Sequence, residues 1–195
     1  RSAPFSFIFS VNEDLIGEIW DDRPAISCEP VMELEKKWTG RSRADKCREI
    51  REKMKEKGAD LFVLTSLDDI AWLLNIRGND IHCCPVVLSY LVMDEKEIRL
   101  FAGESAFSQE IKDSLAADGV TIYPYNDIYT YVQTIPENQK VYLSRAQVNS
   151  RLVDNIPEKV TILDGENMTL LPKAVKNETE VRNEKAAHIK DGVRS

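Results

Sequence analysis

The sequence predicts a three-layer α/β domain, with a six-stranded mixed sheet and helices on both faces. Short apolar segments with the composition of buried strands alternate with segments of helical periodicity between residues 60 and 163. Helices of this length between strands indicate crossover connections and a mainly parallel sheet, whereas one four-residue connection indicates an antiparallel hairpin. Composition agrees, because 43% of the 195 residues are hydrophobic and 30% are charged, as in ordinary globular proteins.

The first forty residues show little periodicity, and residues 19–30, with two prolines, are typical of a linker. The first helix is expected to begin after Ser42, because Asp45 follows three residues later in a capping-box arrangement. Gly58 is its expected end. The Lys and Arg residues of this helix are interpreted as its solvent face. Its apolar residues recur at helical spacing, at Ala44, Cys47, Ile50 and Met54.

Three strands and a helix are expected to follow. Residues 60–65 have the composition of a strand, and Ser66 then begins a helix with Asp69 in a second capping box. Residues 85–93 and 98–102 read as the two strands of the hairpin. The remaining elements alternate: helices are expected at 105–118, 126–135 and 146–156, and strands at 120–125, 140–144 and 159–163.

A last helix is expected after Asn177, with Glu180 completing a capping box. Its apolar face is thin, and no later element is available to pack on it. We therefore expect it to be the first helix of another domain.

Charge and hydropathy exclude two classes of partner. The net charge is −7 and the positive charge is concentrated in one helix, which argues against nucleic acid. No apolar segment approaches the roughly 18 residues that cross a bilayer, so no membrane partner is expected. The spacing of the four cysteines fits neither a zinc ribbon nor a C-x-x-C pair, and we interpret them as free thiols of a cytoplasmic protein: Cys28, Cys47, Cys83 and Cys84.

Residues 67–85, LDDIAWLLNIRGNDIHCCP, hold the densest group of reactive side chains, yet they suggest no catalytic or metal-binding residues. The chain has only two histidines, His82 and His188, which are too few and too far apart for a hydrolytic metal site. A carboxylate site for magnesium or manganese stays open, but capping and turn formation explain the acids better. His82 and Cys83 are neighbours, and neighbours seldom face each other as a nucleophile pair.

Three residues of this stretch are candidates for an interdomain or substrate-facing role: Trp72, Arg77 and Asp80. Trp72 on the helix is more typical of core. Arg77 beside Gly78 could bind a carboxylate in a bidentate manner, although pairing with Asp80 is the preferred interpretation. Asp80 itself lies in a turn where an Asp commonly bonds its own backbone.

Residues 71–80, AWLLNIRGND, with the Pro-Val and strand that follow, closely resemble the middle domain of three-domain Xaa-Pro aminopeptidases of the creatinase/prolidase superfamily. Residues 18–30 are similar to the segment that leaves the first domain of such enzymes, and residues 173–193 to the entry into their catalytic domain. The resemblance covers about residues 13–193. One departure is the Cys83–Cys84 pair, where relatives often carry a polar residue and Asn.

The resemblance implies a creatinase/prolidase N-terminal-type fold and a division of the chain into three parts. Residues 1–40 would be the exit of a preceding domain, residues 41–172 the α/β domain, and residues 173–195 the start of a C-terminal pita-bread catalytic domain. That catalytic domain would hold two divalent metal ions, expected to be manganese, on two Asp, one His and two Glu. Its metal-bound hydroxide would cleave peptides that carry proline at the second position.

None of those ligand positions matches a residue of this chain, so the resemblance implies a fragment that is inactive and metal-free by itself. It would set the geometry between the other domains of a cytoplasmic enzyme and contribute to homodimer contacts. The alternative is a stand-alone protein-binding module without peptidase activity. A third reading, a small α/β enzyme that uses His82 or the cysteines, is the least favoured.

Overall fold

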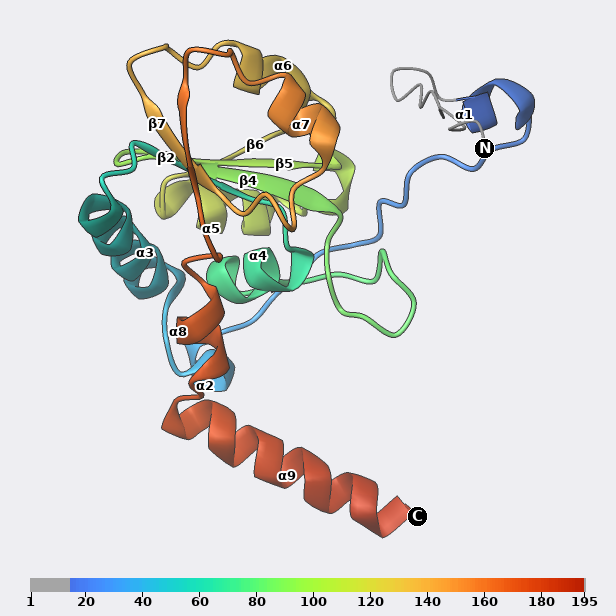
Figure 1. Ribbon diagram of the computed structural model, residues 1–195. Helices are drawn as coiled ribbons and strands as arrows, with labels where there is room; N and C mark the ends of the chain where they lie inside the picture. The colour runs from blue at the N-terminus through green and yellow to red at the C-terminus, as the bar shows by residue number, and fades with distance from the viewer. Residues whose placement is uncertain (1–14, 195) are drawn as a thin grey trace, which may run out of the picture.

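A computed structural model describes residues 15–194 as a sheet between two layers of helices (Figure 1). The sheet has the strand order β6-β5-β4-β2-β7-β8. Its strands are β2 Leu61–Leu64, β4 Ser89–Met93, β5 Ile98–Ala102, β6 Val120–Pro124, β7 Lys140–Leu143 and β8 Thr161–Asp164. The helices that cover it are α3 Arg43–Lys57, α4 Leu67–Leu74 and α5 Gln109–Ala117 on one face, and α6 Asp127–Gln133 and α7 Ser150–Asp154 on the other.

Shorter elements lie around this body. The N-terminal part contributes α1 Leu15–Ile19, β1 Met32–Glu33 and α2 Lys36–Thr39. Strand β3 Ile76–Arg77 follows α4, and a 3-10 turn at Glu104–Ala106 follows β5. The C-terminal part contributes α8 Leu170–Ala174 and α9 Glu178–Arg194, which extends away from the sheet (Figure 1).

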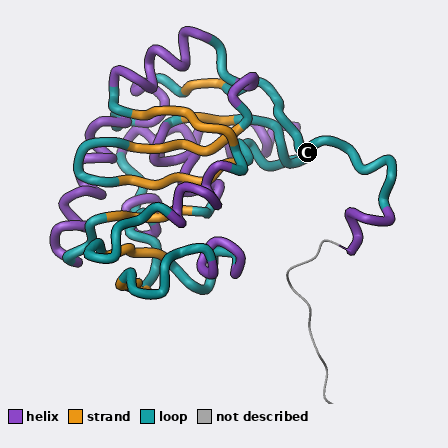
Figure 2. The backbone as a smooth tube through the Cα atoms, turned by 90° about the horizontal axis from the view of Figure 1, so that it is seen from above, coloured by secondary structure: helices purple, strands orange, loops and turns teal. Residues whose placement is uncertain are grey.

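The sheet is mixed, as the sequence predicts, and Figure 2 shows its strands side by side. Strand β2 pairs antiparallel with β4 and parallel with β7, β4 pairs antiparallel with β5, and the β5–β6 and β7–β8 pairs are parallel. The hairpin turn forms because Asp94 Oδ1 accepts the backbone N–H groups of Lys96 and Glu97, each at 2.7 Å. The predicted six-stranded mixed sheet is confirmed.

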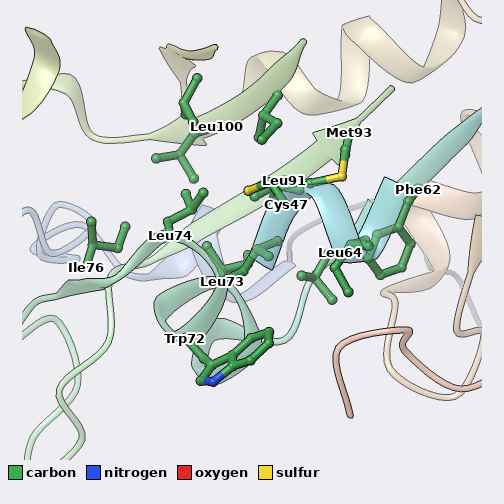
Figure 3. Packing of buried hydrophobic residues seen from close by; sticks show 14 of the residues in the cluster. Cys47, Phe62, Leu64, Trp72, Leu73, Leu74, Ile76, Leu91, Met93 and Leu100 are labelled. Carbon is green, nitrogen blue, oxygen red and sulfur yellow. The ribbon is translucent and has the colours of Figure 1, made fainter. Parts of the chain in front are cut away.

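Alternation along the strands divides the core between the two faces of the sheet. Phe62 and Leu64 of β2 point toward α3 and α4, whereas Leu61 and Val63 belong to the cluster under α6 and α7. Figure 3 shows the first cluster at close range, with side chains from α3, α4, β4 and β5 packed on one another. A sheet buried on both faces accounts for the continuous apolar composition of β2.

Helix α3 begins and ends where the sequence predicts. Ser42 Oγ accepts the Asp45 N–H at 3.1 Å, and Gly58 ends the helix in a left-handed conformation, with φ 64°. Its inner face is different from the prediction, because Arg43 and Lys46 are buried whereas Ala44 is exposed. The interpretation of the basic residues as a solvent face is therefore wrong for these two, whose charged ends reach hydrogen-bond acceptors at the end of α4.

The second predicted capping box does not form at the start of α4. The Ser66 hydroxyl donates to Gln147 Oε1 at 2.6 Å instead of capping the helix. Asp69 is buried and forms an ion pair with Lys173 Nζ at 2.5 Å, and it also accepts Asn167 Nδ2 at 3.0 Å. Asp69 therefore joins α4 to α8 and the loop after β8, a tertiary role that its local pattern does not reveal.

Other helix and strand boundaries also differ from the prediction. The strand expected at 85–93 begins only at Ser89, because Pro85 has no N–H and the Leu88 N–H is donated to Asp80. Asn126 precedes α6 without making a side-chain cap, and the helix expected at 146–156 is reduced to α7, capped by Asn149.

The part of the N-terminal segment that follows the expected linker, residues 32–34, is built into the domain. Strand β1 pairs antiparallel with β3, so that Met32 opposes Arg77 and Glu33 opposes Ile76. The Leu34 N–H extends this contact by donating to Asn75 O at 2.8 Å. A two-residue strand has too few positions to show a period of two, which is why the sequence did not reveal this pair.

The capping box at Asn177 is confirmed, and it also attaches α9 to α2. Asn177 Oδ1 accepts the N–H groups of Thr179 and Glu180, each at 3.0 Å, and the Glu180 carboxylate accepts the Asn177 N–H. The remaining amide hydrogens are used too, because Asn177 Nδ2 donates to Thr39 O at 2.9 Å. Asn183 Nδ2 adds a second bond, to Trp38 O at 2.8 Å.

Substituting Gly40→Ala is expected to destabilise the protein more than substituting Gly58→Ala. Both glycines have left-handed backbones, with φ 73° and 64°, so a β-carbon costs about 1–2 kcal/mol at either position. Only at Gly40 would it also collide with the Asn177 side chain, since nothing lies within 4 Å at Gly58.

Urea unfolding of the two variants, with hydrogen exchange of the Thr179 and Glu180 amides, measures the difference. Equal losses of stability with unchanged protection of these amides would contradict a role for Gly40 in seating α9.

Candidate functional site

The three candidate residues from the sequence lie on α4, on β3 and in the loop after β3, in three separate environments. Trp72 is buried, whereas Arg77 and Asp80 are half-buried. Each side chain binds a different part of the chain, so the structure does not bring the three together in one cavity. The contacts of each show what this region does.

Trp72 belongs to the core and carries a buried amine on its ring. It lies on the side of α4 away from Leu91 and Met93 (Figure 3). Lys46, only 1% exposed, places its Nζ 4.4 Å from the centre of the Trp72 ring. This amine donates to Trp72 O at 2.8 Å and to Asn75 Oδ1 at 2.7 Å. Asn75 can present its amide there because it ends α4 in a left-handed conformation, with φ 56°.

Burial lowers the pKa of Lys46 to about 8, although the carboxylate of Glu180 on α9 acts in the opposite direction. The hydrogen-bond acceptors of this amine are neutral oxygens and the face of an indole ring, which stabilise a cation less than a carboxylate would. Lys46 therefore makes the stability of this region sensitive to pH.

Arg77 of β3 folds back onto the end of α4 and does not pair with Asp80, so the preferred sequence interpretation is wrong. Its Nη1 donates to Ala71 O and to Ile76 O, each at 2.8 Å. Burial lowers the pKa of Arg77, and the Glu180 carboxylate counteracts this effect. Arg77 thus binds a backbone carbonyl group at the end of α4, and its charge interacts with Glu180 in the first turn of α9.

Asp80 holds three backbone and side-chain donors from two distant segments. Its Oδ1 accepts the Ser27 hydroxyl at 2.7 Å and the Glu29 N–H at 2.9 Å. Its Oδ2 accepts the Leu88 N–H at 2.8 Å. The sequence predicted that Asp80 would bond within its own turn. Instead, its carboxylate joins the N-terminal segment to the base of the loop after β3.

Arg43 is the residue of this region that sequence reasoning missed. Its Nε donates to Leu74 O at 2.9 Å, and its Nη1 donates to Ser114 O at 2.9 Å and to Asp118 Oδ2 at 3.0 Å. Its Nη2 forms an ion pair with Glu33 of β1. A signal was present, because Arg43 falls on the apolar stripe of α3, four residues before Cys47.

These contacts form a junction, which we define by Glu33, Arg43, Lys46, Asn75, Arg77 and Asp80. It joins the N-terminal segment, α3, α4 and the first turn of α9. Within residues 15–194, no three His, Cys, Asp or Glu side chains are grouped as a metal site requires. No helix in this part of the chain is long and apolar enough to cross a membrane. The junction is equipped to position chain segments, since its charged groups are already used in structural bonds.

The creatinase/prolidase N-terminal domain family matches residues 22–180. The chain belongs to this family. The family membership and the three-layer fold expected from residues 71–80 are thereby confirmed.

Relatives of this creatinase/prolidase N-terminal domain are much longer than the chain. Xaa-Pro aminopeptidase 1 of Dictyostelium discoideum is 39% identical over 188 residues, which cover 92% of this chain and 29% of the relative. Xaa-Pro aminopeptidase app-1 of Caenorhabditis elegans is 32% identical over 189 residues, which cover 93% of this chain and 30% of the relative. The chain therefore spans about three-tenths of the length of these relatives.

Solved structures agree with this assignment. The crystal structure of X-prolyl aminopeptidase from Caenorhabditis elegans, described as a cytosolic enzyme with a di-nuclear active site, matches with a TM-score of 0.86 and 31% identity. The match covers 94% of this chain and 31% of that one. The prolidase from Pyrococcus horikoshii OT3 matches with a TM-score of 0.50, 14% identity and 76% coverage of this chain, which shows the fold alone.

The stability of this domain is expected to rise with pH where Lys46 titrates. The pKa of Lys46 is lowered from 10.5 to about 8 in the folded state, so between these values the unfolded chain binds more protons than the folded chain. The free energy of unfolding then increases with pH, by about 1–3 kcal/mol across this interval.

Urea unfolding at several pH values, for the wild type and for Lys46→Met, checks this expectation. Met cannot titrate, so the wild type should gain stability relative to the variant above about pH 8. Parallel curves for the two proteins would show that Lys46 does not carry the effect.

Substituting Asp80→Asn is expected to release the N-terminal segment while the sheet stays folded. An amide NH₂ in place of one carboxylate oxygen would face a donor, which costs about 1–3 kcal/mol locally. Hydrogen exchange at residues 27–31 and limited proteolysis before β1 would both become faster. The matched control is Asp113→Asn on exposed α5, where the carboxylate accepts only the Gln109 side chain among the described contacts. Similar exchange in both variants would argue against the role of Asp80.

Proposed function

We propose that this domain is the non-catalytic middle domain of a metal-dependent Xaa-Pro aminopeptidase. One observation carries the proposal: the chain matches the Caenorhabditis elegans X-prolyl aminopeptidase over 94% of its own length but over only 31% of that enzyme. The identity of 39% to the Dictyostelium relative supports it. The whole protein would remove the N-terminal residue of a peptide that carries proline at the second position.

The metal chemistry of such an enzyme would lie outside this domain. Within the described residues no three His, Cys, Asp or Glu side chains are grouped as such a metal site requires. Two divalent ions, which we take to be manganese, would be bound by two Asp, one His and two Glu of a following pita-bread domain. The di-nuclear active site of the Caenorhabditis elegans enzyme supports the number of ions.

The contribution of this domain would be to fix the geometry between its neighbours. We assign residues 1–40 to the exit from a preceding domain, residues 41–172 to the middle domain and residues 173–195 to the start of the catalytic domain. Exposed apolar side chains on α8, directly after α8 and on α9 support the last boundary, because a further domain packed on them would remove them from water. They are Leu171, Val175 and Ile189, exposed by 68%, 67% and 68%.

The three candidate residues then have interdomain roles of different kinds. Asp80 would hold the segment that arrives from the preceding domain, through Ser27 and Glu29. Arg77 would influence the catalytic domain through Glu180, at the start of α9. Trp72 would act from the core, by supporting the buried Lys46 amine. A cytoplasmic location and a homodimer complete the proposal, and the description of the Caenorhabditis elegans enzyme as cytosolic supports the location.

The purified chain with manganese is expected not to cleave an Xaa-Pro peptide, because its described residues provide no ligand set for the metal. A longer protein that includes the following domain should cleave the peptide, and substituting the metal-binding His of that domain should abolish cleavage. The test measures release of the N-terminal amino acid, with the same peptide carrying alanine at the second position as a control.

Two outcomes would contradict the proposal. Metal-dependent turnover by the 195-residue chain alone would show that this domain is catalytic. A following domain without the two Asp, one His and two Glu would favour a protein-binding module instead.

A further inference from the structure

The loop between β3 and β4 has a tight turn from Ile81 to Cys84 at its tip. The Cys84 N–H donates to Ile81 O at 3.0 Å, and the Val86 N–H donates to Cys84 O at 2.8 Å. Cys83 occupies the left-handed region with φ 60°, a conformation that costs a residue with a β-carbon about 1–2 kcal/mol. The turn therefore holds Cys83 in a backbone geometry that free peptides avoid.

The base of this loop is rigid. Asp80 ties it to Ser27, Glu29 and Leu88. On the opposite side Gly78 packs so closely that an added β-carbon would lie 2.9 Å from Val86 O. The backbone that carries the two thiols is thus held in place by these contacts. A ligand that binds both thiols would therefore lose little free energy to ordering the backbone.

Both thiols are available. Cys83 is exposed, Cys84 is partly exposed, and neither forms a disulfide. Figure 1 shows this loop reaching beyond α4, away from the sheet. Cys47 is different, because it is buried in the core and burial raises the pKa of its thiol to about 12. The region therefore presents two adjacent free thiols to solvent.

A direct disulfide between the two is disfavoured by backbone geometry. The described chain has no cis peptide bond, and consecutive Cα atoms across a trans peptide are about 3.8 Å apart. Disulfides usually join Cα atoms about 4.4–6.8 Å apart. One atom inserted between the sulfurs removes this mismatch, because it enlarges the ring that the two side chains close.

The number of protein ligands at this turn determines which kind of metal or metalloid atom it could bind. Structural zinc takes four protein ligands, and although His82 lies in the same turn, no three His, Cys, Asp or Glu side chains of the described residues are grouped so that they could hold a metal ion. Thiolates prefer soft centres. We propose that Cys83 and Cys84 form a dithiol site for a soft centre that makes two bonds to sulfur, represented by monosubstituted trivalent arsenic and by monovalent copper.

Neither reaction requires an oxidant. An arsenoxide forms two arsenic–sulfur bonds, and its oxygen leaves with the two thiol protons as one water molecule. Monovalent copper displaces the two thiol protons and keeps its oxidation state. The site is independent of the peptidase proposal, because it uses no residue of a catalytic domain.

Phenylarsine oxide, added to the reduced 195-residue chain in excess glutathione, tests the site by intact mass and by titration of free thiols. One phenylarsenic group is expected per chain, with the loss of two titratable thiols. Cys83→Ser and Cys84→Ser should each lose the adduct, because a single thiol cannot compete with excess monothiol. Cys28→Ser is the matched control, since Cys28 is also exposed, and it should keep the adduct.

Monovalent copper, supplied with a competing chelator, is the second probe and is scored with the same variants. Retention of a probe by the wild type and by Cys28→Ser, but not by Cys83→Ser or Cys84→Ser, supports the site. Comparison of the two probes shows whether the site takes arsenic or copper. Circular dichroism and thermal unfolding confirm that all variants are folded. The proposal would be overturned if the wild type bound neither phenylarsenic nor monovalent copper. Retention of a probe by Cys83→Ser or Cys84→Ser would also overturn it.

Discussion

The buried guanidinium of Arg43 is the interaction on which the arrangement of this domain depends. A buried cation is costly unless charge and hydrogen bonds compensate it, so its partners must stay in place. Those partners come from four places: the end of α4, the backbone of α5, Asp118 after α5, and Glu33 of β1. Ser114 Oγ also donates to Glu33, at 2.9 Å, which orients that carboxylate. One side chain thereby sets the positions of two helices on the sheet and of the segment that precedes them.

The same region explains why a stretch so rich in reactive residues has no catalytic arrangement. Its acids, amides and cations satisfy one another at the places where segments meet, as Asp80 does with Ser27 and Glu29. Such directional bonds fix the orientation of the segments that they join, which apolar packing by itself does not do. The Cys83–Cys84 pair is the exception, since its thiols are free and accessible.

Local patterns predicted the elements of this fold well. The strands of the sheet, the hairpin, the ends of α3 and the cap of α9 all depend on residues close in sequence. The core position of Trp72 was predicted correctly, and the interdomain roles of the three candidate residues stay a prediction. The predicted Arg77–Asp80 pair and the Asp69 capping box were wrong, because Arg77, Asp80 and Asp69 bind other parts of the chain. The β1–β3 pair was missed because two residues carry no periodicity.

The sequence by itself determined the family, through residues 71–80, and the order of strands and helices, through hydrophobic periodicity and capping. Only the tertiary structure decided which charged groups are buried and what they bind. The physical reason is separation along the chain: three of the four acceptors of Arg43 lie 31, 71 and 75 residues away, and the Asp80 carboxylate reaches back 53 residues to Ser27. A local pattern can place a charged residue on the inner face of a helix, but the partner that makes its burial tolerable is supplied by folding.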